Sequence, residues 1–371
     1  MKIVIDARFY GVEHTGIGRY VINLLDNLKD LNSENDYVVL LRRKYFDALE
    51  FPANWKKVCL DIPHYTIREQ ILLPLFLYKE RPDVFHALQL NFPLFYFGKS
   101  IVTVHDLTQL KLDNNATTLP PTLYRLKHFA INVIFQRIKR VTKIIVPSQT
   151  IKNDLMKSGV KSSKIVTIYE GFDNRLKKQH QSIKTIKKYG LTGPYVIYVG
   201  NAYPHKNVKR AIDAVVHLNE VEDLSLSFAI VSARNNFTVE LAKYVSAKKV
   251  SNYIKLLGYV PDSELGSLIH ESKAFLYPSL AEGFGLPGLE ALAVGTPLLA
   301  SDIPVFKEIY QDSALYFDPK NIKSISDTLI SVLNFSERER KLVLEKGRSQ
   351  AEKYSWGKMV EETLKLYNNL P

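Results

Sequence analysis

Two glutamates near the carboxyl end of the chain, Glu282 and Glu290, stand eight residues apart with a glycine-rich turn between them. Pro287 suits the first position of a short helix running to Val294, and Gly295 suits the residue just past its end. The first turn of such a helix offers backbone N–H groups to an anion. The two carboxylates accept hydrogen bonds from hydroxyl groups. Phosphate donors beside hydroxyl acceptors are what a nucleotide sugar requires.

A lysine follows a second predicted strand, at residues 195–199. The sequence continues Gly-Asn-Ala-Tyr-Pro-His205-Lys206-Asn207. Asn207 suits the N-cap of a helix over residues 208–218. Lys206 then stands at a helix N-terminus, where its charge adds to the helix dipole. We therefore expect Lys206 to stabilise a diphosphate leaving group, although a solvated loop lysine is the alternative.

A glycine-rich turn opens the first long helical pattern, in the run Thr-Gly16-Ile-Gly18-Arg-Tyr. Glycines at this spacing let the backbone approach a phosphate at the helix N-terminus. The pattern is not a dinucleotide fingerprint, because Val21 occupies the third glycine position and the loop after the strand is too long. The alternative is an ordinary tight turn.

A histidine and an aspartate, His105 and Asp106, follow the predicted strand at residues 101–104. Neither a G-x-S-x-G elbow nor an H-E-x-x-H zinc motif accompanies them, so no hydrolase triad or zinc site is indicated. A histidine at this place can donate a hydrogen bond to a ligand. Its alternative role is to cap the strand end.

The run E-G-F-G-L-P-x-L-E-A, followed by G-T-P and A-S-D, resembles the E-x7-E signature of the retaining GT-B glycosyltransferases. T-G-I-G-R-Y and V-H-D resemble motifs of the same family. L-G-Y-V-P-D-S-E-L resembles its turn that contacts the nucleotide base. The family often has arginine where this chain has His205. Likeness to its bacterial mannosyltransferases implies a catalytic set and a donor-binding set. The implied catalytic residues are His105, Lys206 and Glu282, and the donor-binding residues are Gly16, Gly18, His205, Lys206, Tyr259, Val260, Glu282, Gly283, Phe284, Gly285, Leu286 and Glu290.

The resemblance implies transfer of a hexose from a nucleotide diphosphate to a hydroxyl, with retention at the anomeric carbon. Glu282 would hold sugar hydroxyls, Glu290 the ribose hydroxyls, and His105 the sugar near the reacting centre. The same-face route is favoured over a covalent intermediate on Glu282. The chain has no D-x-D motif, so we expect no metal ion and no cofactor. GDP-mannose is the first expectation for the donor.

These loops require strands to position them, and the sequence supplies an alternation of strand and helix patterns. Predicted strands are residues 2–5, 37–41, 83–86, 101–104, 143–147, 165–168, 195–199, 226–231, 254–257, 274–277 and 297–300. The segment 174–192 is rich in lysine and poor in apolar residues, which indicates an interdomain connection. The fold class is α/β, and the resemblance implies the GT-B form, two doubly wound Rossmann-like domains with a cleft between them. We expect an acceptor-side domain over 1–175, a donor domain over 190–355, and a last helix, about 356–371, packed back on the first domain.

The composition of the chain narrows its expected compartment and binding partners. The 371 residues are 46% hydrophobic and carry a net charge of +12, with a single cysteine. One cysteine excludes a disulfide framework and favours a reducing compartment, the cytoplasm. No nucleic-acid-reading motif is present. The stretch 119–143 is basic and apolar without acidic residues, which fits either an anionic membrane surface at the inner face of the plasma membrane or a core helix. A glycan or lipid-linked glycan acceptor is expected, in cell-surface polysaccharide or lipopolysaccharide synthesis.

Four alternatives stay open. The donor could be UDP-glucose or a UDP-N-acetylhexosamine. A sugar-nucleotide 2-epimerase shares the two-domain architecture, but the two motif runs argue against it. A non-catalytic binding protein would not need Lys206, Glu282, Glu290 and His105 together. An NAD enzyme is weakened by the failed dinucleotide fingerprint.

Overall fold

A computed structural model describes residues 1–31, 34–111, 120–172, 176, 183–233 and 235–370. The chain divides into two compact units. The first unit is Met1–Gly171 together with Ser355–Pro371, and the second is Phe172–Tyr354. Within the described residues, no helix is long and apolar enough to cross a membrane.

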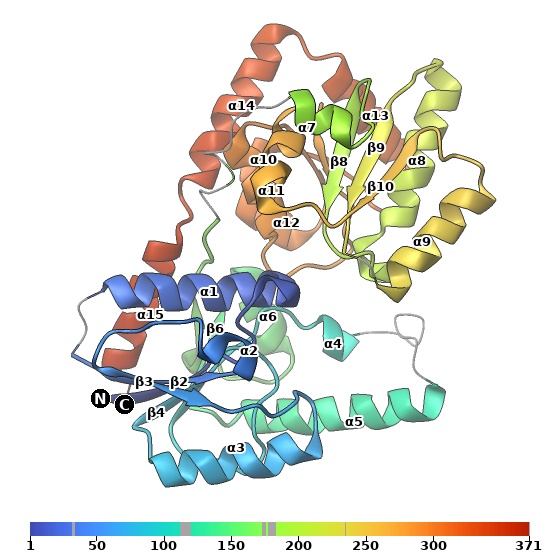
Figure 1. The fold of residues 1–371 in the computed structure, drawn as a ribbon. Coiled ribbons are helices and arrows are strands. Elements are labelled where there is room, and N and C mark those ends of the chain that lie inside the picture. Colours follow the sequence, from blue (N-terminus) through green and yellow to red (C-terminus); the bar gives the residue numbers. More distant parts are fainter. Residues whose placement is uncertain (32–33, 112–119, 173–175, 177–182, 234, 371) are drawn as a thin grey trace. The chain divides into compact units, whose positions relative to one another are not determined.

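The first unit is built on a seven-stranded parallel sheet in the order β3-β2-β1-β4-β5-β6-β7 (Figure 1). Its strands are β1 (Lys2–Asp6), β2 (Asp36–Leu41), β3 (Trp55–Cys59), β4 (Val84–Ala87), β5 (Ser100–Thr103), β6 (Lys143–Val146) and β7 (Ile165–Thr167). Ile5 of β1 lies opposite Val39 on one side and His86 on the other. The strand order reverses between β1 and β4, so ligands are expected outside the carboxyl ends of these two strands.

Helices cover both faces of this sheet. They are α1 (Thr15–Asp30), α2 (Arg43–Phe46), α3 (Ile67–Glu80), α4 (Thr108–Lys111), α5 (Pro121–Ile138), α6 (Gln149–Lys157) and α15 (Trp356–Asn368). One buried cluster joins Val4 and Phe85 of the sheet to Leu73 of α3, Phe135 of α5 and Leu155 of α6. Alternate strand residues point the other way. On that opposite face α1 contacts α15.

The second unit repeats the architecture with a six-stranded parallel sheet, in the order β10-β9-β8-β11-β12-β13. Its strands are β8 (Tyr195–Val199), β9 (Ser227–Val231), β10 (Ile254–Gly258), β11 (Phe275–Tyr277), β12 (Leu298–Ser301) and β13 (Ala314–Phe317). Its helices are α7 (Ile183–Lys188), α8 (Val208–Glu222), α9 (Asn236–Ala247), α10 (Asp262–His270), α11 (Leu286–Val294), α12 (Pro304–Tyr310), α13 (Ile322–Leu333) and α14 (Glu337–Ala351). Here the order reverses between β8 and β11.

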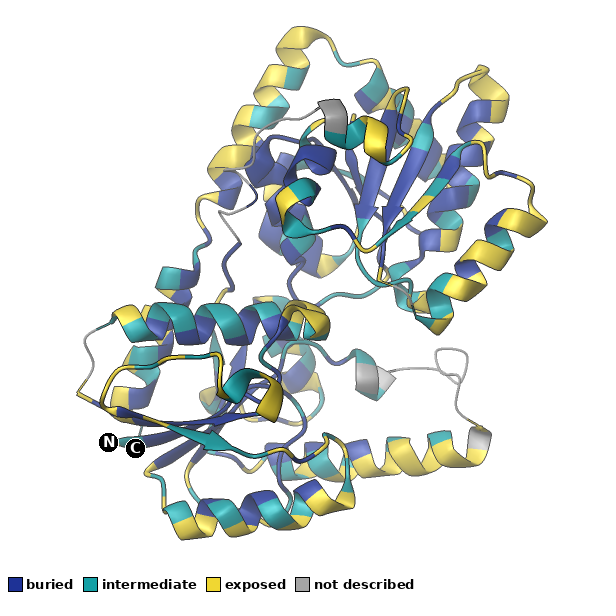
Figure 2. Cartoon of the chain, in the orientation of Figure 1, coloured by how far each residue is buried: buried dark blue, intermediate teal, exposed yellow. Residues whose placement is uncertain are grey.

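The predicted fold class is confirmed, since both units are doubly wound α/β sheets. Every predicted strand is present within one residue at either end, but two strands were missed. The missed strands, β3 and β13, lie at the edges of their sheets. Both are only partly buried, and β3 is drawn largely in the intermediate colour in Figure 2. Lys56 of β3 is exposed. In β3 two lysines interrupt the continuous apolar run by which central parallel strands are recognised, whereas β13 is apolar throughout and its omission has no such explanation.

The predicted helices near the loops differ in detail. The helix between the two glutamates begins at Leu286, which puts Pro287 second rather than first, and it ends at a left-handed Gly295 as predicted. The helix after Lys206 runs to Glu222, four residues beyond the predicted end at 218. Of the predicted connection 174–192, residues 174–175 and 177–182 lie outside the described residues, and α7 belongs to the second unit.

Candidate active site

Lys206 and Glu282 form an ion pair in the second unit. Lys206 follows β8 and Glu282 follows β11, the neighbouring strands at which the strand order reverses. Lys206 Nζ donates to Glu282 Oε1 at 2.7 Å, and the two side chains are 17% and 10% exposed. Parallel neighbours end at the same sheet edge, which is why residues 76 positions apart meet. The pair therefore stands where doubly wound sheets bind ligands.

Ser279 and a backbone bond fix this pair. Ser279 is fully buried, and its Oγ donates to the same Glu282 oxygen at 2.7 Å. The Leu280 N–H donates to the His205 carbonyl oxygen at 2.7 Å. The ring of His205 stacks on Tyr203. These bonds tie the loop after β8 to the loop after β11 and set the direction of the Glu282 carboxylate.

Asn207 corrects a sequence expectation. It occupies the N-cap position of α8, but its φ of 58° is left-handed and its side chain makes no cap hydrogen bond. The side-chain amide instead donates to the carbonyl oxygens of Pro278 at 3.1 Å and Pro319 at 2.8 Å. Arg210 donates to the Asn207 amide oxygen at 3.0 Å. Asn207 thus joins the loops after β8, β11 and β13, which holds Lys206 in place.

The glycine-rich turn before α11 is shaped by Tyr310. Gly285 has a left-handed φ of 101°, and its carbonyl oxygen accepts from the Tyr310 hydroxyl at 2.6 Å. A Cβ at Gly285 would lie 2.2 Å from that hydroxyl oxygen, and one at Gly288 would lie 2.4 Å from it. The glycines are thus required by backbone conformation and by a buried tyrosine, independently of any ligand.

The other predicted residues of this turn are buried. Gly283, Phe284, Leu286 and Glu290 all have little exposed surface, and the Phe284 ring packs edge-on against Tyr354. In the sequence hypothesis the backbone at the start of α11 faces the phosphates, and the Glu290 carboxylate accepts from the ribose hydroxyls. In the loop after β10, Tyr259 is exposed whereas Val260 is buried.

The two predicted glycines of the first unit differ in their surroundings. Both lie inside the first turns of α1. A Cβ added at Gly18 would lie 1.9 Å from the carbonyl oxygen of Gly11, so Gly18 is needed for the approach of that loop. A Cβ added at Gly16 would meet no atom within 4 Å apart from its chain neighbours and the backbone of its own helix. Gly16 is therefore the glycine that a ligand can approach.

His105 is held by a residue that the sequence analysis missed. His105 Nδ1 lies 2.9 Å from Glu170 Oε1, and Nε2 lies 3.0 Å from the Leu88 carbonyl oxygen. A carboxylate and a carbonyl oxygen both accept, so this geometry favours a proton on each ring nitrogen. Burial lowers the pKa of His105, but the hydrogen bond and charge of Glu170 outweigh it, and the net shift is upward.

A buried polar chain extends from this site along the sheet. The His105 ring contacts the Tyr20 ring edge-on, and the Tyr20 hydroxyl lies 3.3 Å from Thr103 Oγ1. His86 bridges Thr103 at 2.9 Å and the Tyr367 hydroxyl at 2.6 Å. Burial lowers the pKa of His86 to about 3, with the nearby charge of His105 as a lesser cause. α15 is thus bonded to the strands that carry His105.

A second charged cluster lies at the carboxyl end of β1. The buried Arg8 guanidinium bonds Asp6 through Nε and Nη2, both at 2.7 Å, and Glu69 Oε1 through Nη2 at 2.7 Å. Asn91 also donates to Glu69, at 2.5 Å. Burial raises the pKa of Asp6, but Arg8 outweighs it and the net shift is downward. The cluster fixes the β1 loop beside the switch point of the first unit.

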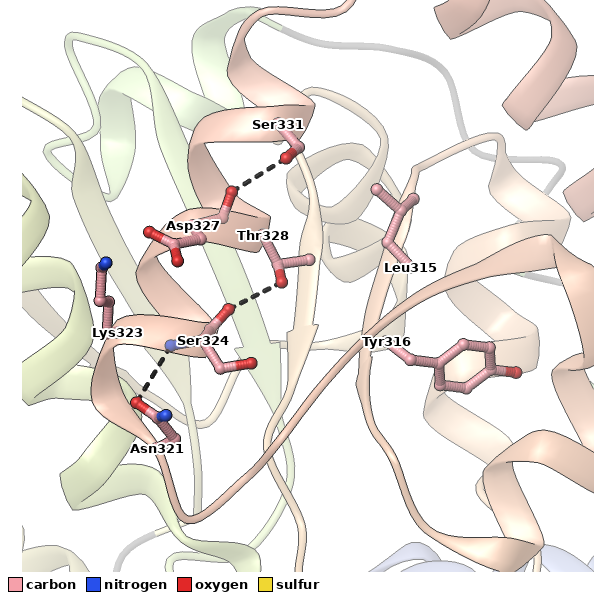
Figure 3. Close-up of a pocket in the computed structure, with 8 residues that line it drawn as sticks. All are labelled: Leu315, Tyr316, Asn321, Lys323, Ser324, Asp327, Thr328 and Ser331. Atoms are coloured by element: carbon pink, nitrogen blue, oxygen red, sulfur yellow. Dashed lines mark hydrogen bonds between the residues drawn. The ribbon is translucent and has the colours of Figure 1, made fainter.

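A surface pocket of about 480 Å³ lies elsewhere in the second unit, between β13 and α13 (Figure 3). Its polar groups bond one another within α13, as Asn321 accepts from Ser324 N at 3.3 Å and Thr328 donates to the Ser324 carbonyl at 2.8 Å. None of the predicted site residues lines it. Across the part of the chain that the structure describes, no group of three or more His, Cys, Asp or Glu could hold a metal ion.

The structure thus brings together Lys206, His205 and Glu282 in the second unit, while Gly16, Gly18 and His105 belong to the first. Sequence reasoning missed the roles of Ser279, Glu170 and Arg8, and it gave Asn207 a helix-capping role instead of one that joins loops. Glu170 follows a predicted strand, so the same rule that selected His105 could have selected it. Ser279 precedes Glu282 by three residues. No sequence signal indicated the bonds of Asn207.

Comparisons with known proteins identify the family of the chain. The family described as Glycosyl transferases group 1 matches residues 163–349, and Glycosyltransferase Family 4 matches residues 14–176. The chain is 28% identical over 358 residues to the O-antigen chain mannosyltransferase RfbU of Salmonella typhimurium, covering 91% of this chain and 95% of that one. It is 29% identical over 191 residues to the O-antigen chain mannosyltransferase B of Escherichia coli, covering 51% and 50%.

Solved structures share the fold at low identity. Sucrose-phosphate synthase from Thermosynechococcus elongatus has a TM-score of 0.78 at 15% identity, covering 100% of this chain and 99% of that one. HepE of Anabaena, in complex with UDP and glucose, has a TM-score of 0.76 at 16% identity, covering 100% of both chains. The expected GT-B architecture is therefore confirmed. Together, the matches over both halves of the chain and the paired loops of the second unit identify the chain as a member of the Glycosyl transferases group 1 family, and its activity as that of a hexosyltransferase.

Proposed function

We propose that this hexosyltransferase moves mannose from GDP-mannose to a hydroxyl of a glycan or lipid-linked glycan, with retention at the anomeric carbon and without a metal ion. The setting is cell-surface polysaccharide or lipopolysaccharide synthesis in the cytoplasm. Two relatives that are O-antigen chain mannosyltransferases support the proposed sugar and setting, and the resemblance of T-G-I-G-R-Y to bacterial mannosyltransferases supports GDP-mannose as the donor.

The Lys206–Glu282 pair is the observation that carries the proposed chemistry. Departure of a nucleoside diphosphate builds negative charge on its oxygens, and Lys206 supplies a fixed positive charge at the switch point of the second sheet. When the diphosphate forms an ion pair with the Lys206 ammonium in place of Glu282, the Glu282 carboxylate becomes free to accept hydrogen bonds from the sugar hydroxyls. Ser279 keeps its bond to Glu282 and so preserves the direction of the carboxylate.

The remaining roles follow the same logic. The backbone at the start of α11 and the open backbone at Gly16 would donate to phosphate oxygens. Glu290 would bind the ribose hydroxyls, and Tyr259 with Val260 would lie beside the base. His105, held by Glu170 through Nδ1, would donate to the sugar near the reacting carbon through Nε2, which would exchange its bond to the Leu88 carbonyl oxygen for one to a sugar oxygen. Lysine and amide donors supply the charge that a metal ion supplies elsewhere, which is the basis for proposing a metal-independent reaction.

The proposed route keeps the acceptor on the face that the diphosphate leaves. The acceptor hydroxyl forms its new bond to the anomeric carbon as the bond to the diphosphate breaks, and the leaving diphosphate oxygen takes the hydroxyl proton. Glu282 is bound to a lysine and a serine through one oxygen, which suits a residue that positions hydroxyls.

The first experiment is thermal unfolding with GDP-mannose, UDP-glucose, UDP-N-acetylglucosamine, GDP, UDP or NAD, each with and without EDTA. A nucleotide at 100 times its Kd stabilises the fold by about 2.7 kcal/mol. We expect stabilisation by the GDP series, unchanged by EDTA. Stabilisation by the UDP series would show that the donor is a UDP-sugar instead of GDP-mannose. Stabilisation by NAD alone would overturn the proposal. NMR of the anomer first released by slow donor hydrolysis tests retention, because the inverted anomer would contradict it.

A further inference from the structure

One surface of the first unit exposes large apolar side chains where a helix normally presents polar ones. On α3, Ile67, Ile71, Leu75 and Tyr78 are all exposed, and Ile67 is 82% exposed. Their spacing of four, four and three residues places them on one stripe of the helix. The opposite stripe, with Leu73 and Leu77, is buried against the sheet. α3 is therefore apolar on both faces, which packing within the unit does not explain.

α5 repeats the arrangement. Leu126, Phe129 and Val133 are exposed at a spacing of three and four residues, and Phe129 is 67% exposed. Phe135 and Ile138 of the same helix are buried in the cluster that also holds Leu73 of α3. Since α3 and α5 pack on the same face of the sheet, their outer stripes point to the same side of the unit (Figures 1 and 2).

The loop between β4 and β5 joins the two helices into one surface. Phe95 and Phe97 of this loop are exposed, the latter by 71%. The Tyr78 hydroxyl donates to the Phe95 carbonyl oxygen at 3.0 Å and accepts from the Phe97 N–H at 3.1 Å. From α5, Arg137 bonds the Tyr96 carbonyl oxygen and stacks its guanidinium 4.9 Å from the Phe97 ring centre. The exposed residues of α3, this loop and α5 are called the apolar face below.

Charge decides which partner fits the apolar face. Arg68 and Lys79 of α3 and Arg125 and Lys127 of α5 are exposed beside the apolar stripes. The two acidic residues of α3 already form ion pairs, because Glu69 is buried against Arg8 and Glu80 pairs with Lys2 and Lys56. α5 has no acidic residue. A two-fold dimer through this face would bring like charges of two copies together. An anionic bilayer instead accepts apolar side chains and attracts lysine and arginine.

We propose that the apolar face docks the enzyme on an anionic lipid bilayer, with Ile67, Ile71, Leu75, Phe95, Phe97, Leu126 and Phe129 at the acyl boundary and the flanking Arg and Lys side chains at the headgroups. The sequence hypothesis placed membrane contact on residues 119–143 alone, of which residue 119 lies outside the described residues. The structure extends the surface to α3 and to the loop before β5. The proposal concerns where the enzyme binds, so its test is independent of donor and acceptor.

The test is sedimentation of the full-length protein with vesicles of phosphatidylcholine alone or mixed with phosphatidylglycerol. We expect binding to the mixed vesicles, weakened by salt. Arg125→Gln with Lys127→Gln should lower the affinity roughly 25-fold, at about 5-fold per charge. Ile67→Gln with Leu75→Gln tests the α3 contribution and should lower it at least roughly 10-fold. The matched control is Val221→Gln with Val239→Gln, exposed valines of the second unit that should bind as wild type.

Failure of the wild type to bind mixed vesicles overturns the proposal, as does equal binding to both kinds of vesicle. Wild-type binding by the Ile67 and Leu75 variant would remove α3 from the surface and contradict the extended face. If a variant unfolds, Phe129→Trp gives a second measurement, because its fluorescence should shift to shorter wavelength on mixed vesicles only. Self-association of the wild type that the same substitutions abolish, without vesicle binding, would assign the face to a second copy instead.

Discussion

Lys206 Nζ lies 2.7 Å from Glu282 Oε1, although the two residues are 76 positions apart. Their loops follow β8 and β11, and Asn207 locks these loops together through Pro278. In the absence of a ligand each side chain neutralises the other. A bound diphosphate would compete with Glu282 for the ammonium, so donor binding and release of the carboxylate toward sugar hydroxyls would be one event.

Lys206→Ala tests the charge on the leaving group. We expect turnover to fall by about 10²- to 10³-fold, roughly 3–4 kcal/mol, because one preorganised donor to the transition state is lost. The substitution also leaves Glu282 partly buried without its ammonium, so Lys206→Ala with Glu282→Gln separates stability from chemistry. Steady-state kinetics with the donor found by thermal shift give the measurement. Lys209→Ala, an exposed lysine of α8, is the control, and equal activity of both single variants would remove Lys206 from the site.

Glu170→Gln tests whether Glu170 positions and charges His105. Glu170 raises the pKa of His105 against the effect of burial, so its neutral replacement lets that pKa fall. We expect the limb of the kcat/KM–pH profile that reports His105 to move to lower pH. Glu170→Asp should restore part of the shift. A profile identical to that of the exposed control Glu220→Gln would contradict this role.

The His105–Glu170 pair should also make the unfolding free energy depend on pH. The folded pKa of His105 is raised, so its contribution is fully present below about pH 6.5, the ordinary value, and is lost as pH rises through the folded pKa. Urea unfolding of wild type and Glu170→Gln between neutral and alkaline pH measures this. The stability difference between the two proteins should shrink as pH rises. A constant difference would argue against a charged His105.

For His86 we expect the unfolding free energy to change with pH in the opposite direction, at acidic pH. Its pKa is lowered to about 3 by burial, so the unfolded chain takes up a proton below about pH 6.5 that the folded chain refuses. Unfolding free energy should therefore decrease on acidification, by up to about 1.4 kcal/mol per pH unit from this residue. His86→Gln should flatten the slope, whereas His217→Gln, an exposed histidine, should not. Equal slopes in all three proteins would contradict the buried neutral ring.

Gly16→Ala and Gly18→Ala separate a ligand-facing glycine from a structural one. A Cβ at Gly18 meets the Gly11 carbonyl oxygen, so Gly18→Ala should lower the unfolding free energy by about 1–3 kcal/mol or more. Gly16 has open space and a helical position, so Gly16→Ala should be neutral or stabilising by up to about 1 kcal/mol. We expect Gly16→Ala nevertheless to weaken donor binding. Unchanged donor affinity in a stable Gly16→Ala protein would exclude Gly16 from the site.

The sequence by itself determined the fold class and all of the central strands, because buried parallel strands require continuous apolar runs. It also determined which loops to inspect, since residues such as Lys206 and His105 directly follow those runs. It did not reveal the edge strands β3 and β13; the two lysines of β3 interrupt its apolar pattern, whereas β13 is an apolar run that was overlooked.

Only the tertiary structure decided which of those residues have partners. The pairing of Lys206 with Glu282 and of His105 with Glu170 depends on strand order, and strand order is set by packing between distant segments. Asn207 shows the same limit, because its sequence position indicated a helix cap while three loops converging on it took its hydrogen bonds. Local patterns carry propensity and burial, whereas hydrogen-bond partners far apart in the sequence are fixed only when the sheet assembles.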